Sequence, residues 1–311
     1  MNNKSEVLVR PWHDELFNTR LPRPEFVASI KRNTSDFVVR EHLCFSPKGS
    51  GEHVYLDLTK VQANTAWVAS QIAKFAEVSQ RDVGYAGRKD RHAITRQWFS
   101  VYLPTRDPEW SGLDVKDVDV HQITRHQRKL RRGEFAANEF QLVIHFDSDV
   151  EREWIEDRLT QIQSEGFPNY FGAQRFGREL HNLDRADQLL RIGLRQSGDR
   201  GMLLSAARSW LFNCYLSDRL ALGDVVGVGP LYGKSRDPQP GEEELKPVYA
   251  AWVCGLRKFD VKVGERQLRA IPEALRWRFQ RKALELRFRL APGTYATSML
   301  RELFVIRDEA G

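Results

Sequence analysis

The sequence predicts an α+β protein in which strands of a half-buried antiparallel sheet are combined with amphipathic helices. In residues 53–59, HVYLDLT, apolar side chains alternate with others at the two-residue period of a strand. Residues 64–78 instead show helical spacing, with three apolar residues on one face: Val68, Ile72 and Phe75. The 311 residues exceed one typical domain of roughly 100–200 residues, so two domains are expected.

The same periodicities predict the remaining elements. Strands are expected near residues 25–31, 36–42, 82–86, 93–103, 118–126, 139–146 and 283–290. Helices are expected over residues 64–78, 150–165 and 201–221 and from about Thr294. Gly166 ends the second of these helices and Pro168 prevents it from resuming, which favours a domain boundary there. The Gly- and Pro-rich residues 223–247 are interpreted as a loop.

The charge balance makes a polyanionic partner plausible. The net charge is +6, with 48 Lys and Arg against 42 Asp and Glu, although many soluble proteins are mildly basic. Two tracts concentrate the positive charge, residues 125–132 and residues 276–289, and Trp277 and Phe279 add aromatic faces to the second. Each tract is either an RNA contact or simply a solvated face.

Compartment and membrane association follow from simple features. Cys44, Cys214 and Cys254 are widely separated, which disfavours a disulfide framework or a zinc site and fits a reducing cytoplasm. The first residues lack the apolar core of a signal peptide, and no run of about 18 apolar residues occurs. A cytoplasmic protein without a membrane span is therefore expected.

Residues 84–101, GYAGRKDRHAITRQWFSV, are the most informative for chemistry. They place Asp90 in a turn between two strands, next to Lys89, Arg91 and His92, and small residues nearby permit close approach of another backbone. Nearby positive charge lowers the pKa of an Asp, so Asp90 should be ionised and able to act as nucleophile or base. Spacing alone favours a surface turn whose charges are solvated.

This segment resembles the signature of the TruD family of tRNA pseudouridine synthases. Five further motifs follow the family's order: KRNTSDFVVRE at 31–41, RKLRRGEFAANEF at 128–140, PNYFGAQRFG at 168–177, LLSAARSWLFN at 203–213 and PGTYATSMLREL at 292–303. The resemblance implies a pseudouridine synthase catalytic domain with a mixed, largely antiparallel sheet and flanking helices, formed by residues 1–155 and 268–311. It also implies an inserted α/β TruD-specific domain over residues 156–267.

The resemblance assigns roles to individual residues. Asp90 inherits the catalytic role, and Lys31 is the expected basic partner of Asp90, unless it is a solvated residue at a strand end. The positions expected to contact the target nucleotide are Phe37, Asn138, Tyr295 and, with them, Phe140. The residues expected to contact RNA are Arg128, Lys129, Arg131 and Arg175.

Each of these assignments has a structural alternative. Phe37 and Phe140 are equally compatible with the core, as most strand Phe residues are. Asn138 is also explained by turn chemistry before a strand, and Tyr295 by packing of a first-turn helix residue on the sheet. Arg175 lies in a segment that is also explained as a purely structural loop.

The implied activity is isomerisation of a uridine in tRNA to pseudouridine, at uridine 13 of tRNA(Glu). The reaction breaks an N-glycosidic bond and forms a C–C bond without net redox change, so no cofactor is expected, and the sequence carries no P-loop, zinc-protease or dinucleotide motif. The expected partner is tRNA, and a monomer is expected. The alternatives are a non-catalytic tRNA-binding protein or RNA chaperone with the same fold and, third, a tRNA methyltransferase.

Overall fold

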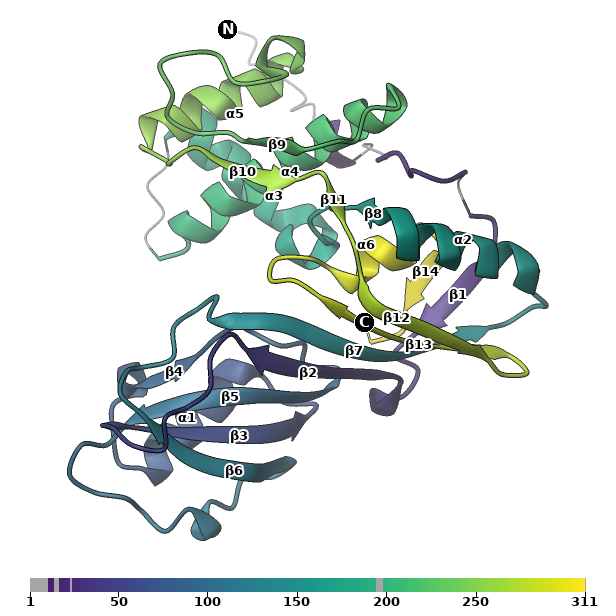
Figure 1. Cartoon of the computed structure of the whole chain (residues 1–311). Coiled ribbons are helices and arrows are strands. Elements are labelled where there is room, and N and C mark those ends of the chain that lie inside the picture. Colours follow the sequence, from purple (N-terminus) through teal and green to yellow (C-terminus); the bar gives the residue numbers. More distant parts are fainter. Residues whose placement is uncertain (1–10, 14–16, 23, 194–197, 311) are drawn as a thin grey trace, which may run out of the picture. The chain divides into compact units, whose positions relative to one another are not determined.

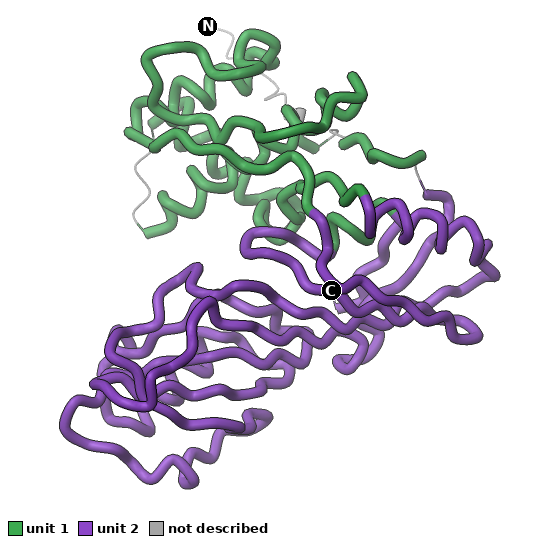
Figure 2. Tube along the Cα trace, viewed as in Figure 1, with its two compact units in different colours: residues 1–23, 165–270, 297–302 green, residues 24–164, 271–296, 303–311 purple. Residues whose placement is uncertain are grey.

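The computed structural model describes residues 11–13, 17–22, 24–193 and 198–310. The chain divides into two compact units (Figure 2). Unit 1 comprises Met1–Arg23, Glu165–Ala270 and Thr297–Glu302, and unit 2 comprises Pro24–Ser164, Ile271–Ala296 and Leu303–Gly311. The family-based domain bounds given above stay a prediction.

Unit 2 is built on a mixed sheet (Figure 1). Its strands are β1 (Val27–Ile30), β2 (Phe37–Leu43), β3 (His53–Val61), β4 (Val83–Tyr85), β5 (Ile94–Tyr102), β6 (Val118–His126), β7 (Phe135–Phe146), β12 (Glu273–Phe279), β13 (Ala283–Leu290) and β14 (Val305–Asp308). The main order is β12-β13-β7-β2-β5-β3-β6, while β1 pairs with β7 and β14, and β4 pairs with β5. Only β2–β5 and β1–β14 are parallel among these described pairs, which confirms an α+β fold with a mixed, largely antiparallel sheet.

Helices follow several strands of this sheet along the chain. α1 (Thr65–Phe75) packs on β3 and β5 through the predicted apolar stripe, which confirms the helix expected at 64–78. α2 (Arg152–Glu165) confirms the next predicted helix, and the Trp154 ring meets Phe26 edge-on at 5.2 Å. α6 (Ala296–Leu300), which belongs to unit 1 from Thr297 on, follows β13 close to the predicted start at Thr294.

The half-buried character expected for residues 53–59 is wrong. Tyr55 and Asp57 are buried, just as Leu56 and Leu58 are on the opposite face. β3 lies between β5 and β6, and side chains from β5 cover its second face: Arg96 binds the Asp57 carboxylate, and the Trp98 ring lies 6.3 Å from that of Tyr55. Alternation in sequence therefore reflects side-chain chemistry here and not exposure.

Unit 1 is mainly helical. Its helices are α3 (His181–Asp187), α4 (Arg200–Ala221), which confirms the predicted helix at 201–221, and α5 (Pro247–Lys258). Two short antiparallel pairs accompany them, β9 (Val228–Leu231) with β10 (Gly264–Gln267) and β8 (Phe167–Pro168) with β11 (Arg269–Ala270).

Short helical turns occur in both units. They are η1 (Pro11–His13), η2 (Thr34–Asp36), η3 (Gln80–Asp82), η4 (Trp110–Gly112), η5 (Ala173–Arg175), η6 (Arg178–Leu180), the π-type η7 (Gln188–Ile192) and η8 (Glu242–Glu244).

Buried aromatic residues hold unit 1 together and satisfy their polar atoms internally. The Trp252 indole N–H donates to Asp187 Oδ1 at 2.8 Å, and the Trp210 indole N–H donates to the Tyr249 hydroxyl at 2.9 Å. Because unpaired buried donors are costly, these bonds stabilise the packing of α5 against α3 and α4.

The interpretation of residues 223–247 as a loop is wrong in part. Residues 228–231 form β9, whose partner β10 lies more than thirty residues later, so no local pattern marks it. α5 was not expected either; it begins with Pro247 in its first turn, where a missing N–H costs nothing. In the part of the chain that the structure describes, no helix has the length and apolar character needed to cross a membrane.

Candidate active site

The turn between β4 and β5 places Asp90 at the centre of a polar network in unit 2. Asp90 Oδ2 accepts a hydrogen bond from Lys31 Nζ at 2.6 Å, and Asp90 Oδ1 accepts one from the His92 amide at 3.2 Å. Lys31 directly follows β1 and has the left-handed backbone conformation, with φ 59°. The structure therefore brings together the two residues that the sequence motifs pair.

A second carboxylate shares the ammonium of Lys31. Asp308 Oδ2 accepts from Lys31 Nζ at 3.0 Å, and the parallel pairing of β1 with β14 sets Asp308 beside Ile30. The Lys31 side chain is 8% exposed, whereas that of Asp90 is 38% exposed. The lysine is thus enclosed between two carboxylates while the Asp90 carboxylate stays accessible from outside.

These contacts determine the charge states. Burial alone would raise the pKa of Asp90, but the hydrogen bond and the charge of Lys31, aided by the His92 amide, outweigh it and hold that pKa below its usual value. Burial alone would lower the pKa of Lys31, but Asp90 and Asp308 outweigh it and raise the pKa. Both groups are therefore ionised at neutral pH, and the main compensating cation lies far from the turn in sequence.

Lys60, which no sequence motif identified, binds the backbone of the same turn. Its side chain is fully buried, and Nζ donates to Asp90 O at 2.9 Å and to Ala63 O at 2.6 Å. Burial lowers its pKa to about 8. Lys60 continues the face of Val54, Leu56 and Leu58 along β3, and a lysine on an apolar strand face is the signal that could have identified it.

Further bonds fix the same turn. The Lys89 amide donates to Thr65 Oγ1 at 3.0 Å, and Gln97 Nε2 donates to Gly87 O at 3.1 Å. Gly84, in β4, has no room for a side chain, because a Cβ there would meet Leu130 O at 2.4 Å. The close backbone approach that the small residues predicted is therefore present.

Asn138 belongs to a second network beside the first. Lys89 Nζ donates to Asn138 Oδ1 at 2.7 Å and pairs with Glu41 Oε2 at 2.5 Å. Burial raises the pKa of Glu41 although the Lys89 charge opposes this. The Lys89 ammonium thereby fixes the amide orientation of Asn138, whose Nδ2 has no hydrogen-bond partner among the described residues.

The aromatic candidates differ in their exposure. Phe37 and Phe140 are 6% and 8% exposed and meet edge-on at 6.2 Å, so both contribute to the sheet core, and the Lys31 ammonium lies 4.9 Å from the Phe37 ring centroid. Tyr295 is half-buried and lies five residues beyond Leu290, which pairs with Asn138. The loop that carries Tyr295 thus leaves the sheet at the Asn138 end of β13.

The basic tract at 125–132 spans the end of β6 and most of the connection to β7. Arg128 pairs with Glu134, and Lys129 Nζ donates to Arg81 O. The Arg131 amide donates to Glu134 Oε2 at 2.7 Å, and the Arg131 side chain is exposed. An acid two residues beyond the tract thus offsets part of a charge that looked uncompensated in sequence.

Arg175 lies in unit 1, in η5, where Nη1 donates to Ser205 Oγ at 3.4 Å.

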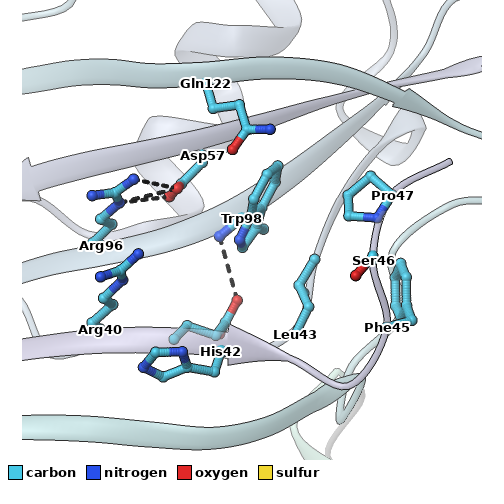
Figure 3. Close-up of a pocket in the computed structure, with 11 residues that line it drawn as sticks. Arg40, His42, Leu43, Phe45, Ser46, Pro47, Asp57, Arg96, Trp98 and Gln122 are labelled. Carbon is cyan, nitrogen blue, oxygen red and sulfur yellow. Dashed lines mark hydrogen bonds and ion pairs between the residues drawn. The ribbon is translucent and has the colours of Figure 1, made fainter. Parts of the chain in front are cut away.

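In unit 2, a hollow on the face of the sheet that carries Arg96 and Trp98 contains none of the predicted site residues (Figure 3). Its charged groups include Arg96, which binds the Asp57 carboxylate there.

Lys60 makes the stability of the protein depend on pH in a specific way. Between its folded pKa of about 8 and its ordinary value of 10.5, the folded protein releases a proton that the unfolded chain retains, so the free energy of unfolding rises with pH. From about pH 7.5 to about pH 9.5, wild type should gain about 1–2 kcal/mol relative to Lys60→Met in urea unfolding. The exposed Lys74→Met variant should follow wild type, and parallel wild-type and Lys60→Met curves would contradict the assignment.

Known proteins are similar to this chain in sequence and in fold. The family model for tRNA pseudouridine synthase D (TruD) matches residues 20–189. The tRNA pseudouridine synthase D of Cellvibrio japonicus is 42% identical, over 92% of this chain and 91% of its own length, and that of Nitrosococcus oceani is 39% identical, over 93% of each chain. A crystal structure from Methanosarcina mazei, described as tRNA pseudouridine synthase D (TruD), superposes with a TM-score of 0.67 at 17% identity, over 93% of this chain and 96% of that one, and supports the fold. The chain therefore belongs to the TruD family of tRNA pseudouridine synthases, which are isomerases.

Proposed function

We propose that this protein isomerises a uridine of tRNA to pseudouridine, at position 13 of tRNA(Glu), with Asp90 as the catalytic carboxylate and without a cofactor. The observation that carries the proposal is the accessible, ionised Asp90 bound to the enclosed ammonium of Lys31 in a member of this family. The carboxylate either attacks a carbon of the ribose or base or removes a sugar proton, and an ionised, oriented oxygen serves both routes.

The turn bonds support a preorganised catalytic group. Lys31 and the His92 amide each hold one oxygen of Asp90, and Lys60 holds its backbone carbonyl. A carboxylate fixed in this way loses little freedom when substrate arrives, which favours the reactive geometry.

Asn138 is proposed to recognise the edge of the flipped uracil. Lys89 occupies its Oδ1, so the Nδ2 group is the part that is directed to substrate, and an amide N–H suits a uracil carbonyl. Lys89 and Glu41 then act as positioning residues for this amide. Tyr295 is proposed to stack on the base, with Phe37 and Phe140 forming the packed wall behind it.

Other proposals complete the assignment. Residues 1–155 and 268–311 form the catalytic domain, residues 156–267 form the inserted domain, and the protein acts as a monomer on tRNA. Arg128, Lys129 and Arg131 contact the phosphate backbone; the exposed Arg131 contributes more than Arg128, which Glu134 partly neutralises.

The Asp90→Asn substitution tests catalysis directly. It keeps the shape of the side chain but removes the base and nucleophile, so pseudouridine formation on a tRNA(Glu) transcript should fall below detection in a tritium-release assay, while tRNA affinity stays within about threefold. Asp308→Asn is the matched control, because it removes the other carboxylate on Lys31, and it should cost less than about tenfold.

Two outcomes would contradict this proposal. Asp90→Asn activity within tenfold of wild type would exclude Asp90 as the catalytic carboxylate. A wild-type protein that binds tRNA but forms no pseudouridine would favour the alternative of a non-catalytic tRNA-binding protein or RNA chaperone.

Asn138→Ala tests recognition of the base. If Nδ2 bonds the uracil, its loss leaves a carbonyl unpaired in the pocket and should cost on the order of 1–3 kcal/mol in kcat/KM, with an unchanged thermal midpoint. The structure places Asn138 inside β7, paired with Glu41 and Leu290, and not in a turn before the strand. If Asn138 only supports this strand, the midpoint should drop while the folded enzyme keeps its rate. Asn138→Asp is the informative companion, because it keeps an oxygen for Lys89 but removes the donor, and it should lose activity like the alanine variant.

A further inference from the structure

One face of α4 in unit 1 gathers arginine side chains. Ser205, Arg208 and Phe212 lie three and seven residues apart and so share a face of the helix. Arg175 reaches this face through its bond to Ser205 Oγ, and the Arg266 guanidinium carbon lies 5.5 Å from the Phe212 ring centroid. Three guanidinium groups thus follow the same side of one helix.

Phe171 orders two of these groups. The Arg266 guanidinium carbon lies 4.0 Å from the Phe171 ring centroid, and that of Arg175 lies 5.6 Å from it. Arg266 also donates from Nε to Asn169 O at 2.9 Å and from Nη2 to Asn169 Oδ1 at 2.6 Å. These bonds and the ring contact orient the plane of the Arg266 guanidinium.

Arg208 has a neutral hydrogen-bond partner and a second cation nearby. It is half-buried, and its Nη1 donates to Lys262 O at 2.8 Å. Burial and then the charge of Arg175 lower the pKa of Arg208, so the groups near it disfavour its positive charge. Within the described residues Arg208 forms no ion pair. A half-buried cation beside a second cation destabilises the fold, and a bound anion would offset that cost.

We propose that Arg175, Arg208 and Arg266 form a site on unit 1 for phosphate groups of the RNA backbone. The inference rests on the proposed function, because a tRNA substrate supplies the polyanion. Guanidinium groups bind phosphate oxygens in pairs. Ser205 and Phe212 bring Arg175 and Arg266 to the face of α4 that carries Arg208. This site adds to the basic tract at 125–132, which belongs to unit 2.

Arg208→Gln tests the site by removing its half-buried charge. We expect tRNA to bind about three- to tenfold more weakly at moderate salt, and the slope of log affinity against log salt to shrink by about 0.7–0.9. The thermal midpoint of the free protein should stay unchanged or rise, because repulsion from Arg175 is relieved. A purely structural Arg208 predicts the reverse pattern, with a lower midpoint and an unchanged salt slope, and that pattern would overturn the proposal.

Arg178→Gln is the matched control, because it removes the same charge from the same unit at a side chain that is 93% exposed. Its affinity should stay within about twofold of wild type. An equal loss of affinity in Arg178→Gln would show that net charge alone explains the effect and would overturn the site.

Arg175→Gln is a second test of the site for the case that Arg208→Gln does not fold. The same change of salt slope is expected, and a wild-type slope in Arg175→Gln would count against the site.

The proposed function and the phosphate site can fail separately. Pseudouridine formation by the wild-type protein tests the function, whereas the slope difference between Arg208→Gln and Arg178→Gln tests the site. A slope difference that appears with tRNA but not with an acidic polypeptide of similar length supports RNA phosphate as the ligand. Equal loss of both ligands would overturn the assignment to RNA.

Discussion

The ion pair between Lys31 and Asp90 is the interaction on which the rest of the site depends. It joins the end of β1 to the turn between β4 and β5, and it keeps an accessible carboxylate charged against the cost of burial. Asp308, at the end of β14, accepts a hydrogen bond from the same ammonium, so Lys31 lies between two carboxylates. The sheet topology makes this possible, because β1 pairs with β14 in parallel and so places Lys31 and Asp308 at the same end of the two strands.

Side chains from outside the turn hold the backbone of the turn that carries Asp90. Lys60 binds the Asp90 carbonyl from the buried face of β3, and Thr65 and Gln97 bind the backbone on the approach to it. The cost is a buried ammonium on Lys60. Such a cost in the core is typical of sites where geometry matters more than stability. Lys89 holds the Asn138 amide, so the turn that carries the carboxylate also orients the amide.

Most of the sheet could be predicted from sequence because its strands alternate and are bounded by turn residues. Residues 118–126 were predicted as a strand with the bounds of β6. The pairing of β9 with β10 could not be predicted, because residues far apart in sequence form it, and α5 was hidden behind a Gly- and Pro-rich segment. In the site, motifs identified Lys31 and Asp90, but Lys60 and Glu41 were missed because charged residues on strands are usually solvated. The apolar face of β3 is the signal for Lys60, whereas Glu41 is buried because β2 lies between β7 and β5.

The pH dependence of single-turnover pseudouridine formation tests the central claim, that Lys31 holds Asp90 ionised, most directly. The rate should fall as pH drops through the pKa of Asp90, because the protonated acid is inactive. In Lys31→Met this acidic limb should move to higher pH, since the cation that lowers the Asp90 pKa is gone. An acidic limb at the same pH in wild type and Lys31→Met would contradict the account.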